Sequence, residues 1–403
     1  QYARQRVANG TAGAVAAACR AVGARAVHVL VLNGDVPLAR SETLQALMRA
    51  HVDSAAPVTV LVSGKGPVES PGYIFRDPHG KVEDIIHAQD LPEGLHLTPE
   101  INTGVYCFDA AWLWAHIGKV APSKNGELYL TSLIGIAHSE GRPAATMHVA
   151  DAVEALGVDT RARLAEAEAA MRDRIRRRWL EAGVTLTDPA STYIDADARI
   201  GQDTVIRPNT HILGTTRIGE NCDIGPGTLL SNAQIGDRCR VLATVIEDST
   251  LESDVRVGPY SHLRGQTHIE RGVDLGNFVE IKKSRLGVGT RSHHFSYLGD
   301  ATIGKDVNIG AGTITCNYDG VNKMPTIIAD GAFIGCDTML VAPVKVGRKA
   351  KTGAGAVVNR DVAPNTLVVG VPARPIVKAA AKPARAVRAS KRVAKRRKAK
   401  AKE

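Results

Sequence analysis

The chain has 403 residues, of which 44% are apolar, 4% aromatic and 23% charged. This length suits two or three domains, and no stretch approaches the ~18 consecutive apolar residues that a membrane-spanning helix needs. No secretory signal precedes the first element, and the six cysteines are scattered without a CxxC pair. We therefore expect a cytoplasmic protein with small buried thiols, not a disulfide framework or a zinc site.

The net charge of +10 is concentrated at one end of the sequence. Residues 378–403 contain twelve Lys or Arg and one acid, so the net charge of the remaining residues is −1. We expect a disordered basic Ala/Lys/Arg tail over 376–403. Because the body is almost neutral, we do not expect nucleic-acid binding except through this tail.

Residues 1–157 alternate strand-like and helix-like stretches, which favours an α/β, Rossmann-like domain. Residues 26–32 (AVHVLVL) form a continuous apolar run, which predicts a strand buried on both faces. Further strands are predicted at 58–62 and 104–108, and a helix at 41–51. We expect this domain to be incomplete, because the sequence opens at Gln1 without a strand and glycine-rich loop before residue 26.

The first candidate site follows the apolar run, at Asn33-Gly34-Asp35. Open α/β sheets bind ligands beyond the carboxyl ends of their strands. A carboxylate there can hold Mg²⁺, which usually bridges to phosphate oxygens. A simple turn aspartate is the alternative interpretation.

A connecting helix and linker are predicted over 158–190. Residues 160–183 are rich in Ala, Arg and Glu, contain neither Gly nor Pro before the end, and close at Gly183.

Beyond residue 190 one apolar residue returns at every sixth position. Such spacing fits neither a single helix nor a plain strand, but it is typical of a three-sided parallel β-helix. We predict this fold over 191–375, with about ten coils of roughly 18 residues. The runs are Ile194, Ile200, Ile206, Ile212, Ile218 and Ile224; Leu251, Val257, Leu263, Ile269, Leu275 and Ile281; and Ile328, Ile334, Leu340 and Val346.

One stretch, Thr315–Pro325, breaks the period and must leave the stack, and insertions in solenoids tend to lie on the binding face. Near it, Arg264 and Lys282 are 18 residues apart, which predicts two stacked cations suited to a phosphorylated substrate. His294 is a candidate general base, because the ordinary pKa of histidine lies near 6.5. The alternative is that these residues form an ordinary solvated face.

Several segments together resemble one family, the bifunctional N-acetylglucosamine-1-phosphate uridyltransferase/glucosamine-1-phosphate N-acetyltransferase. They are NGDVPL (33–38), EINTG (100–104), GPYSHLRG (258–265), GNFVEIKKSRLG (276–287), HHFSYLGDATIG (293–304) and NIGAGTITCNYDG (308–320). The resemblance covers nearly all of 1–372. It implies a left-handed parallel β-helix, a homotrimer with acetyltransferase sites between subunits, and a role in making UDP-N-acetylglucosamine for cell-wall and lipopolysaccharide precursors.

For the acetyltransferase half, the resemblance implies that His294 is the general base for the amine of glucosamine 1-phosphate. Arg264, Lys282, Tyr297 and Asn308 match residues that bind this sugar phosphate. Glu280 is expected to partner His294. The positions that match acetyl-CoA contacts are Ala311, Asn317, Tyr318, Cys336 and Ala354.

For the uridyltransferase half, the resemblance implies UTP as a co-substrate and Mg²⁺ as cofactor, with Asp35 and Asp159 as metal ligands. The positions that match UDP-sugar contacts are Gln5, Gly10, Thr11, Asn33, Gly34 and Asn102. The family's opening glycine-rich loop and catalytic lysine have no counterpart in the sequence, so we expect impaired uridylyl transfer.

Two other hypotheses stay open from the sequence. One is a basic scaffold protein whose tail binds nucleic acid, with binding that depends steeply on salt. The other is an inactive homologue that keeps the hexapeptide-repeat fold.

Overall fold

The computed structural model describes residues 2–23, 26–64, 72–87 and 100–376. Its contacts divide into two compact units, Gln1–Arg174 and Ile175–Glu403. Among the described residues, none of the helices has the length and apolar character needed to cross a bilayer. Residues 377–403 of the predicted basic tail lie outside the described part of the chain.

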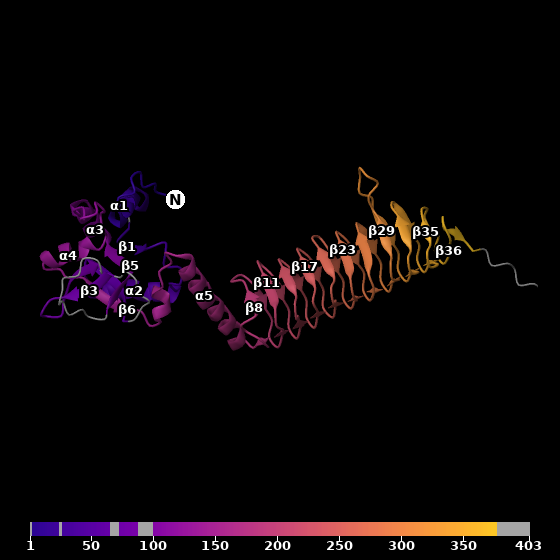
Figure 1. Cartoon of the computed structure of the whole chain (residues 1–403), viewed down its shortest axis with the longest axis horizontal. Coiled ribbons are helices and arrows are strands. Elements are labelled where there is room, and N and C mark those ends of the chain that lie inside the picture. Colours follow the sequence, from indigo (N-terminus) through magenta and orange to yellow (C-terminus); the bar gives the residue numbers. More distant parts are fainter. Residues whose placement is uncertain (1, 24–25, 65–71, 88–99, 377–403) are drawn as a thin grey trace, which may run out of the picture. The chain divides into compact units, whose positions relative to one another are not determined.

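The first unit combines helices with one mixed sheet (Figure 1). Its elements are α1 (Thr11–Val22), β1 (His28–Leu32), α2 (Ser41–Ser54), β2 (Val58–Ser63), β3 (Gly72–Arg76), β4 (Val82–His87), β5 (Ile101–Asp109), α3 (Ala110–His116), η2 (Ile117–Lys119), α4 (Ser132–Ser139), β6 (Ala145–His148), η3 (Ala152–Ala155) and α5 (Arg161–Glu181), which continues into the second unit.

Strand β5 organises this sheet, because it pairs antiparallel with β1, β2 and β3. The strand order is β4-β3-β5-β2-β6, and β2 pairs parallel with β6. Every residue of β2 is buried, as expected for an apolar run in the middle of a sheet. The α/β class predicted from the sequence is therefore confirmed, with a mixed sheet.

The prediction for residues 26–32 was wrong in one respect. Strand β1 was expected to be buried on both faces, but only Val29 is buried and Leu32 is exposed. Among the described strands β1 pairs with β5 alone, so it lies at an edge and part of its apolar surface stays open.

A pair of histidine rings joins helix α2, which carries His51, to strand β1, which carries His28. His28 and His51 meet edge to face with ring centroids 5.0 Å apart, and His51 Nδ1 is 3.0 Å from Thr59 Oγ1. Burial, followed by the nearby His28, lowers the pKa of His51, while Asp109 raises it slightly. Neutral His51 is therefore the form that the fold favours.

We expect acid to destabilise the protein through His51. A pKa that is depressed by folding adds stability above the ordinary value of 6.5, and this stability is lost as the pH falls through the folded pKa. Over this range the free energy of unfolding falls by at most about 1.4 kcal/mol for each pH unit. Urea unfolding at pH 8 to 5 should show a weaker pH dependence in His51→Gln, whereas exposed His79→Gln should behave like wild type; identical curves for all three would contradict the assignment.

The second unit is a solenoid of short strands in three sheets. The first sheet contains β7 (Thr185–Leu186), β10 (Val205–Ile206), β13 (Asp223–Ile224), β16 (Arg240–Val241), β19 (Arg256–Val257), β22 (Asp274–Leu275), β25 (Arg291–Ser292), β28 (Asn308–Ile309), β31 (Phe333–Ile334), β34 (Lys351–Thr352), β36 (Leu367–Val369) and β37 (Arg374–Pro375). The second sheet contains β8 (Thr192–Ile194), β11 (Thr210–Leu213), β14 (Leu229–Ser231), β17 (Val245–Glu247), β20 (His262–Arg264), β23 (Val279–Lys282), β26 (Ser296–Gly299), β29 (Ile314–Cys316), β32 (Met339–Val341) and β35 (Val357–Val358). The third sheet contains β9 (Arg199–Ile200), β12 (Arg217–Ile218), β15 (Gln234–Ile235), β18 (Thr250–Leu251), β21 (His268–Ile269), β24 (Arg285–Leu286), β27 (Ala301–Ile303), β30 (Thr326–Ile328) and β33 (Val344–Val346).

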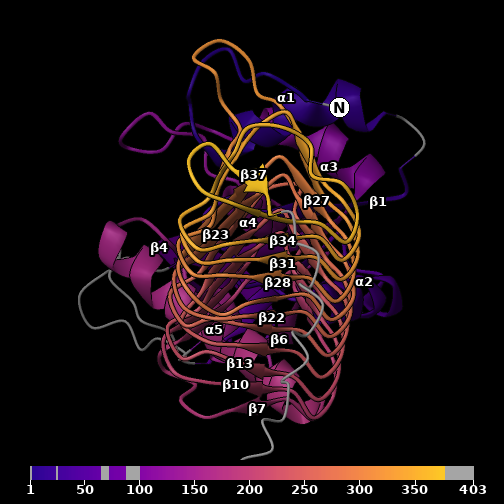
Figure 2. The ribbon, with the colours of Figure 1, turned by 90° about the vertical axis from the view of Figure 1, so that its right-hand side faces the viewer.

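Successive coils follow one outline and enclose a single apolar interior (Figure 2). The residues at every sixth position fill it: Ile206, Ile212 and Ile224 have no exposed surface. Each strand pairs in parallel with the equivalent strand of the next coil, except for the antiparallel end pair β36–β37. The hexapeptide period therefore predicted both the solenoid and its core.

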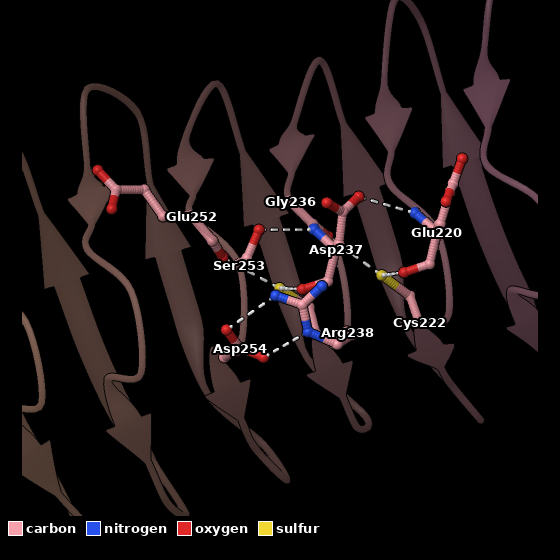
Figure 3. Close-up of polar contacts among 9 residues, drawn as sticks. Glu220, Cys222, Gly236, Asp237, Arg238, Glu252, Ser253 and Asp254 are labelled. Atoms are coloured by element: carbon pink, nitrogen blue, oxygen red, sulfur yellow. Dashed lines mark hydrogen bonds and ion pairs between the residues drawn. The ribbon is translucent and has the colours of Figure 1, made fainter.

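Side chains at the corners connect neighbouring coils (Figure 3). Glu220 N donates to Asp237 Oδ1 at 3.0 Å, and Asp237 N donates in turn to Ser253 Oγ at 3.1 Å. Arg238 forms two bonds with the Asp254 carboxylate, at 2.8 and 3.0 Å. The first two bonds satisfy backbone N–H groups that the sharp corners leave without a strand partner, and the arginine–aspartate pair joins side chains of neighbouring coils.

All six cysteines are free thiols. Cys107, Cys222 and Cys239 are buried, as expected, but Cys19 and Cys316 are half-buried and Cys336 is exposed. The expectation of buried thiols therefore fails for Cys336, which lies at a solvent-facing corner after β31.

The break in the period is a loop that leaves the stack between β29 and β30 (Figure 1). Register partners in neighbouring coils are 17 residues apart in sequence from Arg285 to Thr302, but 25 residues apart from Thr302 to Ile327. The register on either side of the loop is otherwise unchanged. The predicted insertion is thus confirmed, but it begins after Cys316, because Thr315 and Cys316 still belong to β29 and pair with β32.

Candidate functional site

The two predicted cations lie side by side on the second sheet. Arg264 of β20 is the register partner of Lys282 of β23, as the spacing of 18 residues predicted. The Arg264 guanidinium donates to Glu280 Oε1 at 2.8 Å, which raises the pKa of Arg264 further. Glu280, expected to partner His294, is instead bonded to Arg264, because both side chains project from the same outer face of neighbouring strands.

The missing side chain at Gly299 leaves space for two of the predicted site residues, Tyr297 and Asn317, beside the strand of Lys282. Gly299 is the register partner of Lys282 in the next coil, so no side chain covers the lysine there. A Cβ at this position would lie 2.4 Å from Tyr297 Oη and 2.8 Å from Asn317 Nδ2. The tyrosine hydroxyl and the asparagine amide therefore both lie against the glycine backbone, in the space that a side chain would fill.

Lys323, on the loop that leaves the stack, adds a third cation that the sequence analysis missed. Close contact with Lys282 lowers the pKa of Lys323, whereas Asp300 and Tyr297 raise it. Two ammonium groups this close repel each other and attract a divalent anion. The available signal was a lysine inside an insertion beside two predicted cations, but the loop has no period that would place it. We call Arg264, Lys282, Tyr297, Asn317 and Lys323 the loop cluster.

His294 lies at an exposed corner between β25 and β26. The register Ser292–Ile309–Ile334 places Ala311 and Cys336 at the same corner in the following coils. The pairing of β31 with β34 continues this line to Ala354. These four residues, His294, Ala311, Cys336 and Ala354, form a row that we call the His294 edge.

The loop cluster and the His294 edge are the two ends of one surface. Strand β26 runs from the His294 corner past Tyr297 to Gly299, beside Lys282. Five residues of extended chain span up to about 16 Å. A sugar phosphate held by a long cationic side chain at one end and by an imidazole at the other can cover this distance.

The other predicted residues of this half divide between the two ends. Asn308 is half-buried in β28, on the first sheet in the coil after His294. Asn317 is buried at the start of the loop, and Tyr318 is exposed on it. The proposed acetyl-CoA positions are therefore split, with three on the His294 edge and two at the far end of the strands.

In the first unit, a cavity of about 360 Å³ lies between α1 and the end of β1. Thr11, Asn33, Gly34 and Asp35, all predicted from the sequence, line it. The Asn33 side chain packs on Gly104, where φ is 78° and a Cβ would lie 2.5 Å from Asn33 Nδ2. Glycine is required at this position.

Gln5, Gly10 and Thr11 also come together. Gln5 Nε2 donates to the Gly10 carbonyl at 3.1 Å, and Leu130 N donates to Thr11 Oγ1 at 2.9 Å. Asn102 lies in β5, where Nδ2 donates to Tyr106 Oη at 2.7 Å and Oδ1 accepts from Gly104 N at 3.1 Å. Asn102 is therefore held in place by its own strand.

Asp35 and Asp159 lie on adjoining loops, because Val158 N donates to the Asp35 carbonyl at 2.8 Å. Both side chains are exposed. No group of three or more His, Cys, Asp or Glu able to hold a metal occurs in the described residues. Two carboxylates fit Mg²⁺, which usually takes one or two from the protein and completes its shell with water and substrate phosphates.

A buried carboxylate, that of Glu154, fixes this loop. Glu154 is 3% exposed and accepts from Arg40 N at 2.9 Å and from Thr43 Oγ1 at 3.1 Å. Arg40 also pairs with Asp151 at 2.8 Å. These bonds tie η3 to the start of α2, and η3 leads directly to Asp159.

The fold and the two sites define a transferase with a nucleotidyltransferase unit followed by a hexapeptide-repeat solenoid. Residues 1–183 match the model of the nucleotidyl transferase family, and residues 197–232 match that of the bacterial transferase hexapeptide (six repeats).

Similar proteins are described as the bifunctional protein GlmU. That of Heliobacterium modesticaldum is 45% identical over 369 residues, which cover 91% of this chain and 81% of the relative. That of Pelobacter propionicus is 45% identical over 362 residues, with 89% and 79% coverage, and that of Exiguobacterium sibiricum is 43% identical over 370 residues, with 92% and 82% coverage. The chain belongs to the family of the bifunctional protein GlmU, in agreement with the resemblance noted in the sequence.

The contact between the two lysines can be tested directly. Because Lys282 lowers the pKa of Lys323, Lys323 should react faster with acetic anhydride near pH 8 than an isolated exposed lysine. Lys282→Met should slow that labelling and leave Lys305 unchanged, as measured by competitive labelling and peptide mass spectrometry. Equal labelling of Lys323 in both proteins would contradict the contact.

Proposed function

We propose that the solenoid transfers the acetyl group of acetyl-CoA to the amine of glucosamine 1-phosphate, giving N-acetylglucosamine 1-phosphate. The first unit then transfers uridylyl from UTP to this product, giving UDP-N-acetylglucosamine. Family membership supports both activities. The observation that carries the proposal is the surface along β26, with an imidazole at one end and three cations at the other.

In the proposed complex the sugar phosphate lies along β26. Arg264, Lys282 and Lys323 hold the phosphate, since charge-assisted hydrogen bonds to phosphate are among the strongest available to a protein. Tyr297 contacts the sugar ring between them. The amine then lies at the His294 corner.

His294 acts there as general base. Its imidazole takes a proton from the amine as the nitrogen attacks the thioester carbonyl, and the tetrahedral intermediate collapses with loss of the CoA thiolate. The small side chains of Ala311 and Ala354 allow the pantetheine arm to lie along the His294 edge and bring the thioester to this corner.

A homotrimer would complete the acetyl-CoA site. In one chain Asn317 and Tyr318 lie at the opposite end of the strands from the His294 edge. The corner next to His294 is also apolar and open: Tyr260, Phe278 and Phe295 are 64%, 59% and 56% exposed, and the first two rings stack at 5.5 Å. Such an exposed aromatic row is typical of a protein interface, and packing it against another subunit would bring that subunit's loop to this edge.

In the first unit, Asp35 and Asp159 would hold Mg²⁺, which supplies charge neutralisation for the phosphates of UTP when it is bound. Thr11, Asn33 and Gly34 line the cavity in which the nucleotide sugar would lie. The Gln5–Gly10 bond fixes the backbone just before Thr11, which lines this cavity.

The acetyltransferase assignment predicts release of free thiol from acetyl-CoA and glucosamine 1-phosphate. His294→Ala should lower this rate by about 10²–10⁴-fold, the usual contribution of a general base, without changing the assembly mass. Deleting 378–403 should leave the rate nearly unchanged. Thiol release at the same rate in wild type and His294→Ala would refute the role of His294.

The division of the site between subunits predicts complementation. His294→Ala and Asn317→Ala subunits, each weak alone, should regain activity when co-expressed with different tags and purified as mixed trimers. Every mixed cyclic trimer, whatever its ratio of the two subunits, contains one intact site, so about a third of the sites regain activity. If edge and loop instead act within one chain, the mixed trimers will be as weak as their parents.

The magnesium site predicts the effect of a single substitution. Asp35→Asn should lower pyrophosphate release from UTP and N-acetylglucosamine 1-phosphate at least about tenfold and raise the Mg²⁺ concentration needed for half the maximal rate. Arg4→Gln, at another exposed position of the same unit, is the control. An unchanged Mg²⁺ dependence in Asp35→Asn would exclude it as a ligand. The same assay on wild type tests the expectation of weak uridylyl transfer.

A further inference from the structure

Asp300 occupies the corner between β26 and β27, directly below the loop that leaves the stack. Its φ is 49°, in the left-handed region that aspartate and asparagine tolerate better than most residues. It is half-buried, and it belongs neither to the loop cluster nor to the His294 edge.

Three hydrogen bonds connect Asp300 to the coil below and to both ends of the loop. Its N–H donates to the Lys282 carbonyl at 3.0 Å, and its own carbonyl accepts from Thr326 N at 3.1 Å, where the chain returns to the stack. Its carboxylate Oδ2 accepts from Asn317 Nδ2 at 2.5 Å, where the chain departs. Asp300 is therefore bonded to both ends of the loop and to the strand that carries Lys282.

The rest of the loop is held by its own bonds. Met324 N donates to the Asn317 carbonyl at 2.8 Å, and Tyr318 pairs with Lys323 across the loop. Asp319 Oδ1 accepts from Val321 N and Asn322 N, at 2.8 and 2.6 Å. The loop is thus a small rigid hairpin, and the orientation of its base decides where Lys323 lies.

The carboxylate also balances charge. Lys282 and Lys323 repel each other, and Asp300 is the nearby anion that favours the charged form of Lys323. Without it the two ammonium groups would move apart or lose a proton.

We propose that Asp300 is a positioning residue of the acetyltransferase site, which holds Asn317 and keeps Lys323 beside Lys282 in readiness for the substrate phosphate. This inference rests on the proposed acetyl transfer. By donating Nδ2 to Asp300, Asn317 is left with its amide oxygen as a free acceptor for a ligand N–H.

The test compares Asp300→Asn with wild type in the full-length protein. Asparagine keeps the corner conformation and can still accept from Asn317, but it removes the charge. We expect KM for glucosamine 1-phosphate to rise about tenfold with kcat changed about twofold or less, as for a lost charge-assisted contact. The alkaline limb of the KM profile should also move to lower pH, because Lys323 then loses its proton earlier; a merely loosened loop would not cause that shift.

Matched variants complete the experiment. Asp306→Asn changes an aspartate at the next left-handed corner, where φ is 54°, and should behave as wild type. Asp300→Ala also removes the acceptor for Asn317, so its KM should rise further. Wild-type KM values for Asp300→Asn at every pH would overturn the proposal.

A second readout separates this proposal from the proposed function. If wild type releases no thiol, the proposed acetyl transfer is refuted. The effect of Asp300 on Lys323 can still be measured by anhydride labelling. Asp300→Asn should make Lys323 more reactive near pH 8, with Lys305 as internal reference and unaltered melting as evidence of folding. Unchanged labelling would show that the carboxylate does not act on Lys323.

Discussion

The second unit depends on hydrogen bonding between consecutive coils around an interior of aliphatic side chains. Each strand is only two to four residues long, so it is not stable by itself and exists because the coils above and below satisfy its backbone. The buried residue at every sixth position fixes which side chains face out. Residues one coil apart in sequence thereby become neighbours in space, and the site is built from such rows: Arg264 next to Lys282, and His294 next to Ala311.

The loop between β29 and β30 breaks this regularity without disturbing it. Regular coils place cations along a row but cannot close over a ligand, because every outer side chain points away from the axis. The hairpin supplies what the rows lack, a cation that returns over the sheet toward Lys282. Gly299 provides the space, and Asp300 sets the direction. In the absence of a ligand this arrangement keeps like charges close together, and a bound phosphate would relieve their repulsion.

Much of this could be read from the sequence, and the failures have physical reasons. The six-residue period predicted the solenoid, its core and the Arg264–Lys282 pair, because the geometry of a repeat is fixed by its spacing. Lys323 was missed because an insertion has no period. Glu280 was expected to partner His294, whereas its carboxylate accepts a hydrogen bond from Arg264 on the neighbouring strand. In the first unit the burial of β1 was overestimated, since an apolar run does not reveal how many neighbours a strand will have. The Asp35 loop was found from its place after a strand, but its approach to Asp159 depends on a backbone bond that no pattern predicts.

The unchanged register on both sides of the loop has a broader consequence. A coil of this solenoid can gain eight residues at one corner while Ile303 and Ile328 still stack as if nothing had been inserted. Scaffold and recognition are therefore separable modules: the core is constrained by its neighbours, whereas each corner is a place where new chemistry can be grafted. Differences in ligand choice among such proteins would then lie mainly in the length and composition of the corner insertions. The aliphatic core of the solenoid would change little.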